Sequence, residues 1–177
     1  MSVRAPLART ALAAALAAAA GTAPAAARAQ DAGRAAPRAD DGPDLDPRVE
    51  VCAVALAAVL RGLARDAGPV HVVPGWRTAD GALAEPELVR RAAARAEALA
   101  RHAVRLAEPA EDGGWLRPPG RLLFALEAPR LGPGARLAWL TMDVTGDDGL
   151  PRRLRFSLKR TDRGWVPLEW GPAEDES

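Results

Sequence analysis

The chain has 177 residues, with 24 Lys and Arg, 23 Asp and Glu, and a formal net charge of +1. The first 29 residues hold three arginines and no acid, so residues 30–177 carry 21 basic against 23 acidic side chains. A slightly acidic body gives no global electrostatic reason to bind nucleic acid or anionic lipid. Beyond residue 29 no segment approaches the about 20 apolar residues of a membrane span.

The first 29 residues have the three parts of a secretory signal peptide. Arg4 and Arg9 make a positively charged start, residues 11–20 are only Ala and Leu, and residues 27–29 read Ala-Arg-Ala, which suits a signal peptidase. The apolar run is too short to cross a bilayer. We therefore expect cleavage before Gln30, a periplasmic or secreted mature protein, and no stable membrane insertion afterwards. An uncleaved anchor or an Ala-rich disordered tail is the alternative.

The first predicted helix is apolar on every side. Asp46 is its expected N-cap, Pro47 stands at its first position, and Gly68-Pro69 is its expected end. Its centre, residues 51–60, has no polar face, so it needs cover from more than one direction. We expect this helix in the middle of the fold, with Cys52, the only cysteine, as a buried and unreactive thiol.

A short strand and an amphipathic helix follow. Residues 70–73 alternate as a strand that is expected to end near Pro74-Gly75. The second helix is predicted to start around Glu85-Pro86 and to lie on the surface. It carries one apolar stripe with spacings of four and three, made by Ala92, Ala96, Leu99, Ala103 and Leu106.

The C-terminal third is a run of predicted strands at 122–127, 136–145, 153–161 and 165–170, separated by Gly- and Asp-rich turns. Its last hairpin is expected to close with a three-residue loop in which Gly164 is left-handed. That register pairs Thr161 with Trp165, Leu158 with Leu168, and Phe156 with Trp170. A two-residue loop would oppose Phe156 to Glu169, so the pattern favours the longer one.

The preceding hairpin has a register that agrees with this one. It sets Met142 against Leu154 and Leu140 against Phe156 on an apolar face. On the polar face the same register sets Asp143 against Arg153, an oppositely charged cross-strand pair. The two hairpins together predict an antiparallel meander.

The order of elements predicts an α+β fold, with two main helices packed on a curved antiparallel sheet that ends in the meander. It resembles the nuclear-transport-factor-like and cystatin-like folds, although the former usually have more helix before their first strand. The closing Leu154-Arg155-Phe156-Ser157-Leu158 and Gly164-Trp165-Val166-Pro167-Leu168 segments resemble the last hairpin of many small exported bacterial proteins of unknown function. This resemblance implies either an enzyme or a binding module.

No catalytic, metal or cofactor motif is recognisable, and we expect none of these sites. His71 lies on the first strand and His102 at the edge of the helical stripe, so both are expected to be ordinary boundary histidines. Asp143, Asp147 and Asp148 surround one turn, but their spacing does not match the twelve-residue calcium loop. A solvated turn is the preferred interpretation. We expect the protein to bind no cofactor.

The polar face of the meander is the candidate binding surface. The predicted register places Trp139 opposite Ser157 on this face, together with Arg155, Lys159 and Trp165. An exposed Trp139 would suit a small ligand or an envelope protein partner. The alternatives are a solvated face with cross-strand ion pairs, or a Trp139 covered by Trp76, Trp115 or the leader.

These features predict a domain organisation and a function. Residues 1–29 are the signal peptide, 30–45 a flexible leader, 46–171 a single domain and 172–177 a disordered tail. The expected function is a non-catalytic ligand- or partner-binding module. One alternative is an isomerase or hydrolase with a cone-shaped pocket, which requires His71 or His102 beside an acid in a cavity. A purely structural envelope role is the other.

Overall fold

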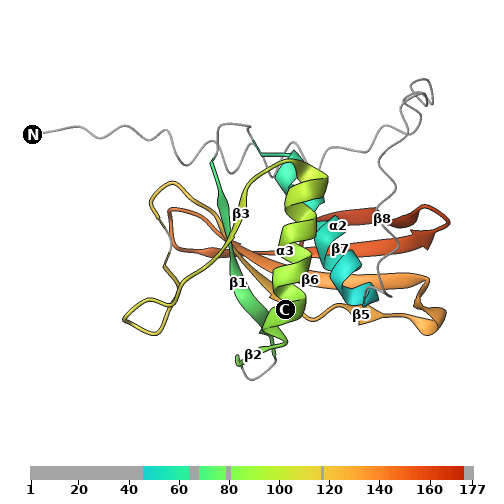
Figure 1. Cartoon of the computed structure of the whole chain (residues 1–177), viewed down its shortest axis with the longest axis horizontal. Helices are drawn as coiled ribbons and strands as arrows, with labels where there is room; N and C mark the ends of the chain where they lie inside the picture. Colours follow the sequence, from blue (N-terminus) through green and yellow to red (C-terminus); the bar gives the residue numbers. More distant parts are fainter. Residues whose placement is uncertain (1–45, 64–67, 79–80, 117, 174–177) are drawn as a thin grey trace, which may run out of the picture.

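The computed structural model describes residues 46–63, 68–78, 81–116 and 118–173; the predicted signal peptide and leader, and the last four tail residues, lie outside these ranges. Two helices pack on one side of a curled, mixed and mostly antiparallel sheet of eight strands (Figure 1). The elements in chain order are α2 (Pro47–Arg61), β1 (Val70–Arg77), β2 (Leu83–Ala84), α3 (Pro86–Ala100), β3 (Val104–Leu106), β4 (Leu123–Glu127), β5 (Arg130–Leu131), η1 (Pro133–Ala135), β6 (Leu137–Thr145), β7 (Pro151–Thr161) and β8 (Gly164–Pro172). The predicted α+β fold is therefore confirmed.

Helix α2 begins as its sequence predicts and ends earlier. The Asp46 side chain accepts a hydrogen bond from the backbone N–H of Arg48 at 2.9 Å, and Pro47 occupies the first helical position. The helix ends at Arg61, not at Gly68-Pro69, because Gly62 is the first poor helix former after the apolar run. Its amide donates to the carbonyl of Val59 at 2.9 Å in a tightened last turn.

The apolar helix α2 forms the centre of the core, as its lack of a polar face predicts. It contacts α3 on one side and β6 and β8 on the other. Leu56 and Cys52 are fully buried and Leu60 is 1 % exposed. Burial raises the pKa of the Cys52 thiol well above its usual value, which is the state of a packed side chain and not of a nucleophile.

Helix α3 is shorter than its apolar stripe. It ends at Ala100 because Arg101 adopts a left-handed conformation, with a φ of 55°, and donates its backbone N–H to the carbonyl of Glu97. Ala103 and Leu106 therefore lie beyond the helix, the latter in β3. The buried face is small-residue rich, consisting of Val89, Ala92, Ala93 and Ala96. This face lets α3 pack against α2 and β1.

Strand β1 is longer than predicted, and it has both parallel and antiparallel neighbours. It passes through Pro74-Gly75 to Arg77, and its pairing with β4 shifts register between Val72 and Trp76. A bulge of this kind tolerates a proline inside a strand. Its neighbours β3 and β4 run parallel to it, whereas β2 is antiparallel.

The β6–β7 hairpin has the predicted register. Met142 pairs with Leu154 and Leu140 with Phe156, on the side covered by the helices. Asp143 pairs with Arg153 on the opposite side. We call this opposite, helix-free side of β4 to β8 the outer face. Its residues alternate along each strand with residues of the core.

The β7–β8 hairpin confirms one predicted pair and corrects two. Thr161 pairs with Gly164 across a two-residue turn, so the predicted Thr161–Trp165 and Leu158–Leu168 pairs are wrong. A register shift then leaves Leu168 as an extra residue, because Leu158 pairs with Pro167 and Ser157 with Glu169. Beyond this bulge Phe156 meets Trp170, as predicted, and the two rings stack at 5.4 Å between centroids.

The order of the main strands places the meander at one end of the sheet. The order is β2-β1-β4-β6-β7-β8, with β3 beside β1 and β5 beside β6. Strand β8 extends to Pro172, and Ala173 still donates its backbone N–H to the carbonyl of Arg153 at 2.9 Å. Neither α2 nor α3 has the length and apolarity to cross a membrane.

Candidate functional site

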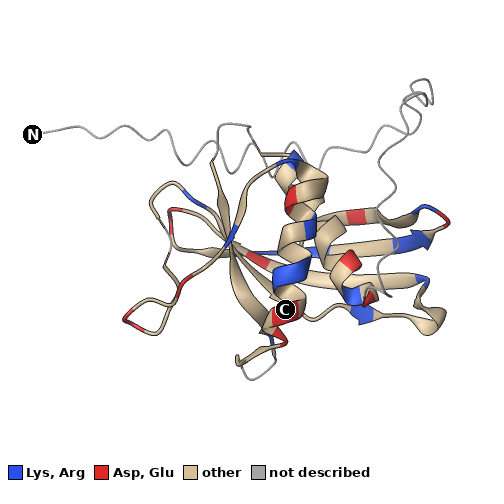
Figure 2. Cartoon of the chain, viewed as in Figure 1, with Lys and Arg blue, Asp and Glu red and all other residues tan. Residues whose placement is uncertain are grey.

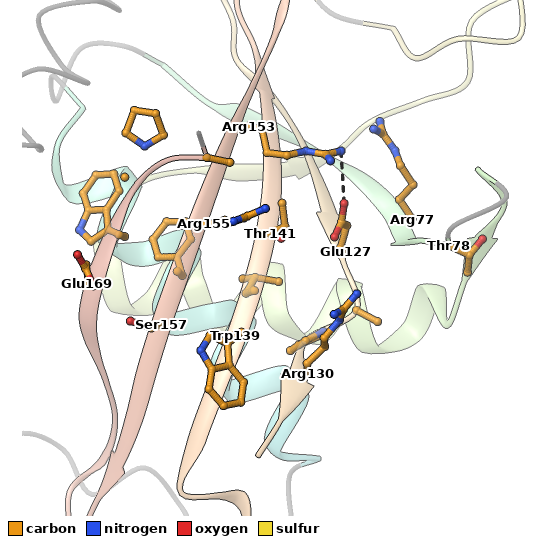
Figure 3. A pocket seen from close by; sticks show the side chains of 18 residues that line it. Arg77, Thr78, Glu127, Arg130, Trp139, Thr141, Arg153, Arg155, Ser157 and Glu169 are labelled. Carbon is orange, nitrogen blue, oxygen red and sulfur yellow. Dashed lines mark ion pairs between the residues drawn. The ribbon is translucent and has the colours of Figure 1, made fainter. Parts of the chain in front are cut away.

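An open groove of about 1370 Å³ lies on the outer face. Residues of β4 to β8, the β4–β5 connection and the segment 171–173 line it, together with Arg77 and Thr78 at the end of β1. Figure 3 shows it with the helices behind the strands, so the groove belongs to the side of the sheet away from the core. This is the face on which the sequence predicts a binding surface.

The strand register arranges the groove in rows across the sheet. One row consists of four successive cross-strand partners, Arg130, Trp139, Ser157 and Glu169. A second row is formed by Thr141, Arg155 and Gly171. Because neighbouring strands lie about 4.8 Å apart, each row presents its side chains as a line perpendicular to the strands.

Trp139 is placed as predicted, opposite Ser157, and its side chain is 47 % exposed. The β5–β6 turn passes against its ring. A Cβ added at Gly132 would lie 3.3 Å from Cζ3 of the indole, so the absence of a side chain there allows the close approach. The Gly132 amide donates to the carbonyl of Leu137 at 2.9 Å, which closes the turn. The indole is therefore held in place at one edge and open to solvent.

An ion-pair network forms one wall of the groove. The buried carboxylate of Asp143 accepts from Nη1 of Arg77 at 2.6 Å and from Nε of Arg153 at 2.9 Å. Arg153 also contacts Glu127, with its Nη2 3.4 Å from Oε1, as the dashed line in Figure 3 marks. The predicted Asp143–Arg153 pair is confirmed, and Arg77 is a partner that the sequence did not reveal.

Other charged groups of the outer face have no such partner. Within the described ranges, Arg130, Arg155, Lys159 and Glu169 take part in no ion pair. The Arg155 guanidinium points toward Thr141 in Figure 3, away from Glu169. Lys159 lies further along β7, between Leu137 and Val166, and does not line the groove. Charged residues of both signs are spread over the strands, as the colours of the ribbon in Figure 2 show.

Trp165 is not on the outer face. The two-residue turn sets it opposite Arg160, one position away from the predicted alignment, which reverses the side of the sheet it faces. Its side chain is 5 % exposed and belongs to the core, and its Nε1 has no hydrogen-bond partner among the residues that the structure describes. Trp165 is therefore corrected from a surface residue to a packing residue.

The two histidines lie outside this groove. Nε2 of His102 is 2.8 Å from the carbonyl oxygen of Gly68, in the turn after α3. His71 is half-buried in β1, and its pKa is lowered by burial first and by the charge of Arg105 second. The geometry that the enzyme alternative requires, a histidine beside an acid in a cavity, does not occur in the groove.

The aspartates near the β6–β7 turn have separate partners. Asp148 binds Arg152 at 2.7 Å, Asp147 accepts from the amide of Gly120 at 2.8 Å, and Asp143 belongs to the network above. Among the described residues there is no group of three or more His, Cys, Asp or Glu that could hold a metal ion.

The residues that complete the groove carry no periodic signal in the sequence. Arg130 precedes Gly132-Pro133-Gly134, which reads as a loop, and the two-residue β5 is too short to show a period. The sequence signal that could have indicated a pair of strands here is the apolar Leu131 and Leu137 on either side of the turn.

Comparison of the chain with protein-family models, characterised proteins and solved structures found no match.

Proposed function

We propose that the chain is exported and that its mature body is a non-catalytic binding module of the cell envelope, which takes a small ligand or partner in the groove of the outer face. The observation that carries this proposal is the exposure of Trp139. A large apolar ring, 47 % exposed, stands in a groove that also holds Arg130 and Arg155, which take part in no ion pair in the described structure. Tryptophan is enriched at interfaces, because its ring gives a large apolar contact and its N–H a polar one.

The composition of the groove favours binding over catalysis. Its acidic side chains are Glu127 on β4, which contacts Arg153, and Glu169 on β8, which is exposed. Neither carboxylate stands beside a histidine, cysteine or lysine in the lining, so the groove lacks a proton-transfer pair. The isomerase or hydrolase alternative gains no support from it.

The binding proposal is tested by calorimetry. Purified residues 30–177 are titrated with a metabolite panel and with low-molecular-mass fractions of an envelope extract. We expect at least one component to bind, to lose most of its affinity in Trp139→Phe, and to keep it in Trp115→Phe. Trp115 is a matched control, since it is half-buried and does not line the groove. No binder, or equal binding to both variants, would overturn the proposal.

The export proposal has a separate test. The full chain is expressed in a bacterium with a periplasm, and the protein is recovered from each cell fraction. We expect the product in the periplasm or medium with Gln30 at its N-terminus. Recovery of the intact chain from the cytosol, with Met1 retained, would contradict this part of the proposal and leave the binding test unaffected.

A further inference from the structure

The row across the groove has opposite charges at its two ends. Its members are successive cross-strand partners, with Arg130 on β5, Trp139 on β6, Ser157 on β7 and Glu169 on β8. Three strand spacings of about 4.8 Å place the two charged positions about 14 Å apart. A ligand that lies along this row therefore meets a cation at one end and a carboxylate at the other.

The two end charges are not neutralised by other groups in the described part of the chain. Neither Arg130 nor Glu169 has an ion pair there, whereas the remaining acids near the groove, Glu127 and Asp143, are bound by arginines. The row is longer than the about 8–10 Å over which salt solution screens exposed charges, so its two ends act on a ligand as separate charges. Arg155 lies one row away and points toward Thr141.

The middle of the row has an apolar and a polar contact. The indole of Trp139 is half exposed, and the Ser157 hydroxyl beside it is partly exposed. The groove, at about 1370 Å³, exceeds the about 300–1000 Å³ of sites for a compact small molecule. Its size favours an elongated ligand that continues beyond a single ring.

We propose, resting on the proposed binding function, that the groove takes a short zwitterionic peptide of about three or four residues. Three or four extended residues span about 10–14 Å, which matches the length of the row. The peptide lies across the strands with its terminal carboxylate at Arg130, its terminal ammonium at Glu169 and an apolar side chain on Trp139. Arg155 is available to a backbone carbonyl.

Charge complementarity separates this ligand from the other candidates. A small monoanion would leave Glu169 without a partner. A polyanion that covered the row would bring like charge to Glu169, and such repulsion is a common source of selectivity against a ligand. A neutral ring would use Trp139 alone. Only a ligand with opposite charges at its ends satisfies both ends of the row.

The test uses Ala-Leu-Ala in four forms: with both termini free, with the N-terminus acetylated, with the C-terminus amidated, and with both modified. Binding to residues 30–177 is measured by calorimetry at low ionic strength. We expect the free peptide to bind at least tenfold more tightly than the doubly modified form, with the two singly modified forms between them. The difference should shrink as salt is added.

Two variants assign each end. Arg130→Gln should abolish the difference between the peptide acid and its amide but keep the penalty for acetylation. Glu169→Gln should abolish the penalty for acetylation but keep the difference between the peptide acid and its amide. Both positions are exposed, so neither change should affect folding appreciably, and Arg136→Gln is a control at an exposed arginine outside the groove.

The outcomes distinguish this inference from the proposed function. If all four peptide forms bind equally, or none binds while an extract component still requires Trp139, the peptide inference is overturned and the binding function stands. If neither peptides nor extract components bind, both are overturned. Losses of equal size for acid and amide in Arg130→Gln would also contradict the assigned orientation.

Discussion

Replacement of Asp143, the buried carboxylate that binds two arginines of the groove lining, should destabilise the protein far more than its position on the outer face suggests. Asp143 accepts hydrogen bonds from Arg77 at 2.6 Å and from Arg153 at 2.9 and 3.3 Å. Its side chain is only 10 % exposed, whereas the arginine side chains are 43 % and 49 % exposed. In Asp143→Asn the two cations face each other without an anion between them.

The expected loss in the free energy of unfolding follows from this difference in exposure. Removal of one partner from a fully buried ion pair costs about 3–5 kcal/mol, and from an exposed pair about 0–1 kcal/mol. Here the acid is buried but the arginines regain water when released, so we expect about 2 kcal/mol. For a protein of this size that loss lowers the melting temperature by about 4–8 °C.

The assay is urea unfolding of residues 30–177, with Asp148→Asn as the matched control. Asp148 makes one ion pair with Arg152 near the turn of the same hairpin, and its substitution should cost about 0.5 kcal/mol. A double-mutant cycle between Asp143→Asn and Arg153→Gln should give a coupling of about 1 kcal/mol or more. Equal, small losses for both aspartate variants, with no coupling, would refute the assigned role of the network.

Three further changes test the core and its boundary. Asp46→Ala removes the N-cap of α2 and should cost about 1 kcal/mol by urea unfolding. Hydrogen bonds from Arg48 lower the pKa of Asp46. Its ionised form therefore contributes fully to stability above about pH 5, and this contribution is lost as the pH falls through the lowered pKa. The two proteins should converge in acid, and a constant difference would contradict this. Leu56→Ala should cost about 2–5 kcal/mol, and a loss below 1 kcal/mol would show that α2 is not central. Cys52 should react with a thiol reagent quickly in urea but, in native buffer, only as fast as the core opens; immediate native reaction would exclude its burial.

The parts of the fold with a long hydrophobic pattern could be predicted from sequence. The core position of α2 followed from its lack of a polar face, and the β6–β7 register followed from the pairing of Met142 and Leu140 with apolar partners. These predictions succeed because many apolar side chains must face the core in one register, and a slip by one residue would expose all of them. The placement of Trp139 on the outer face is a consequence of the same register.

The parts that could not be predicted depend on single irregular residues. A two-residue β7–β8 turn in a regular ladder would oppose Phe156 to Glu169, so the apolar pattern disfavours it. The extra residue Leu168 reconciles that turn with the Phe156–Trp170 pair. A bulge has no periodic signature, so the sequence pattern predicts the wrong face of the sheet for Trp165.

The short strands β2, β3 and β5 are two or three residues long and carry no alternation. Strand β5 has the largest consequence for the site, because it brings Arg130 beside Trp139. That neighbour is what gives the outer face a row with two charged ends.

The most direct test of the account is the set of five indole N–H signals of the ¹⁵N-labelled protein, followed as Ala-Leu-Ala is added. Each signal is assigned by the corresponding Trp→Phe variant. The groove predicts that the signal of Trp139 shifts in a saturable manner, accompanied at most by that of Trp170, which also lines the groove, while the buried Trp76 and Trp165 do not respond. Shifts at Trp76 or Trp165 with none at Trp139 would place binding in the core and contradict a recognition site on the outer face.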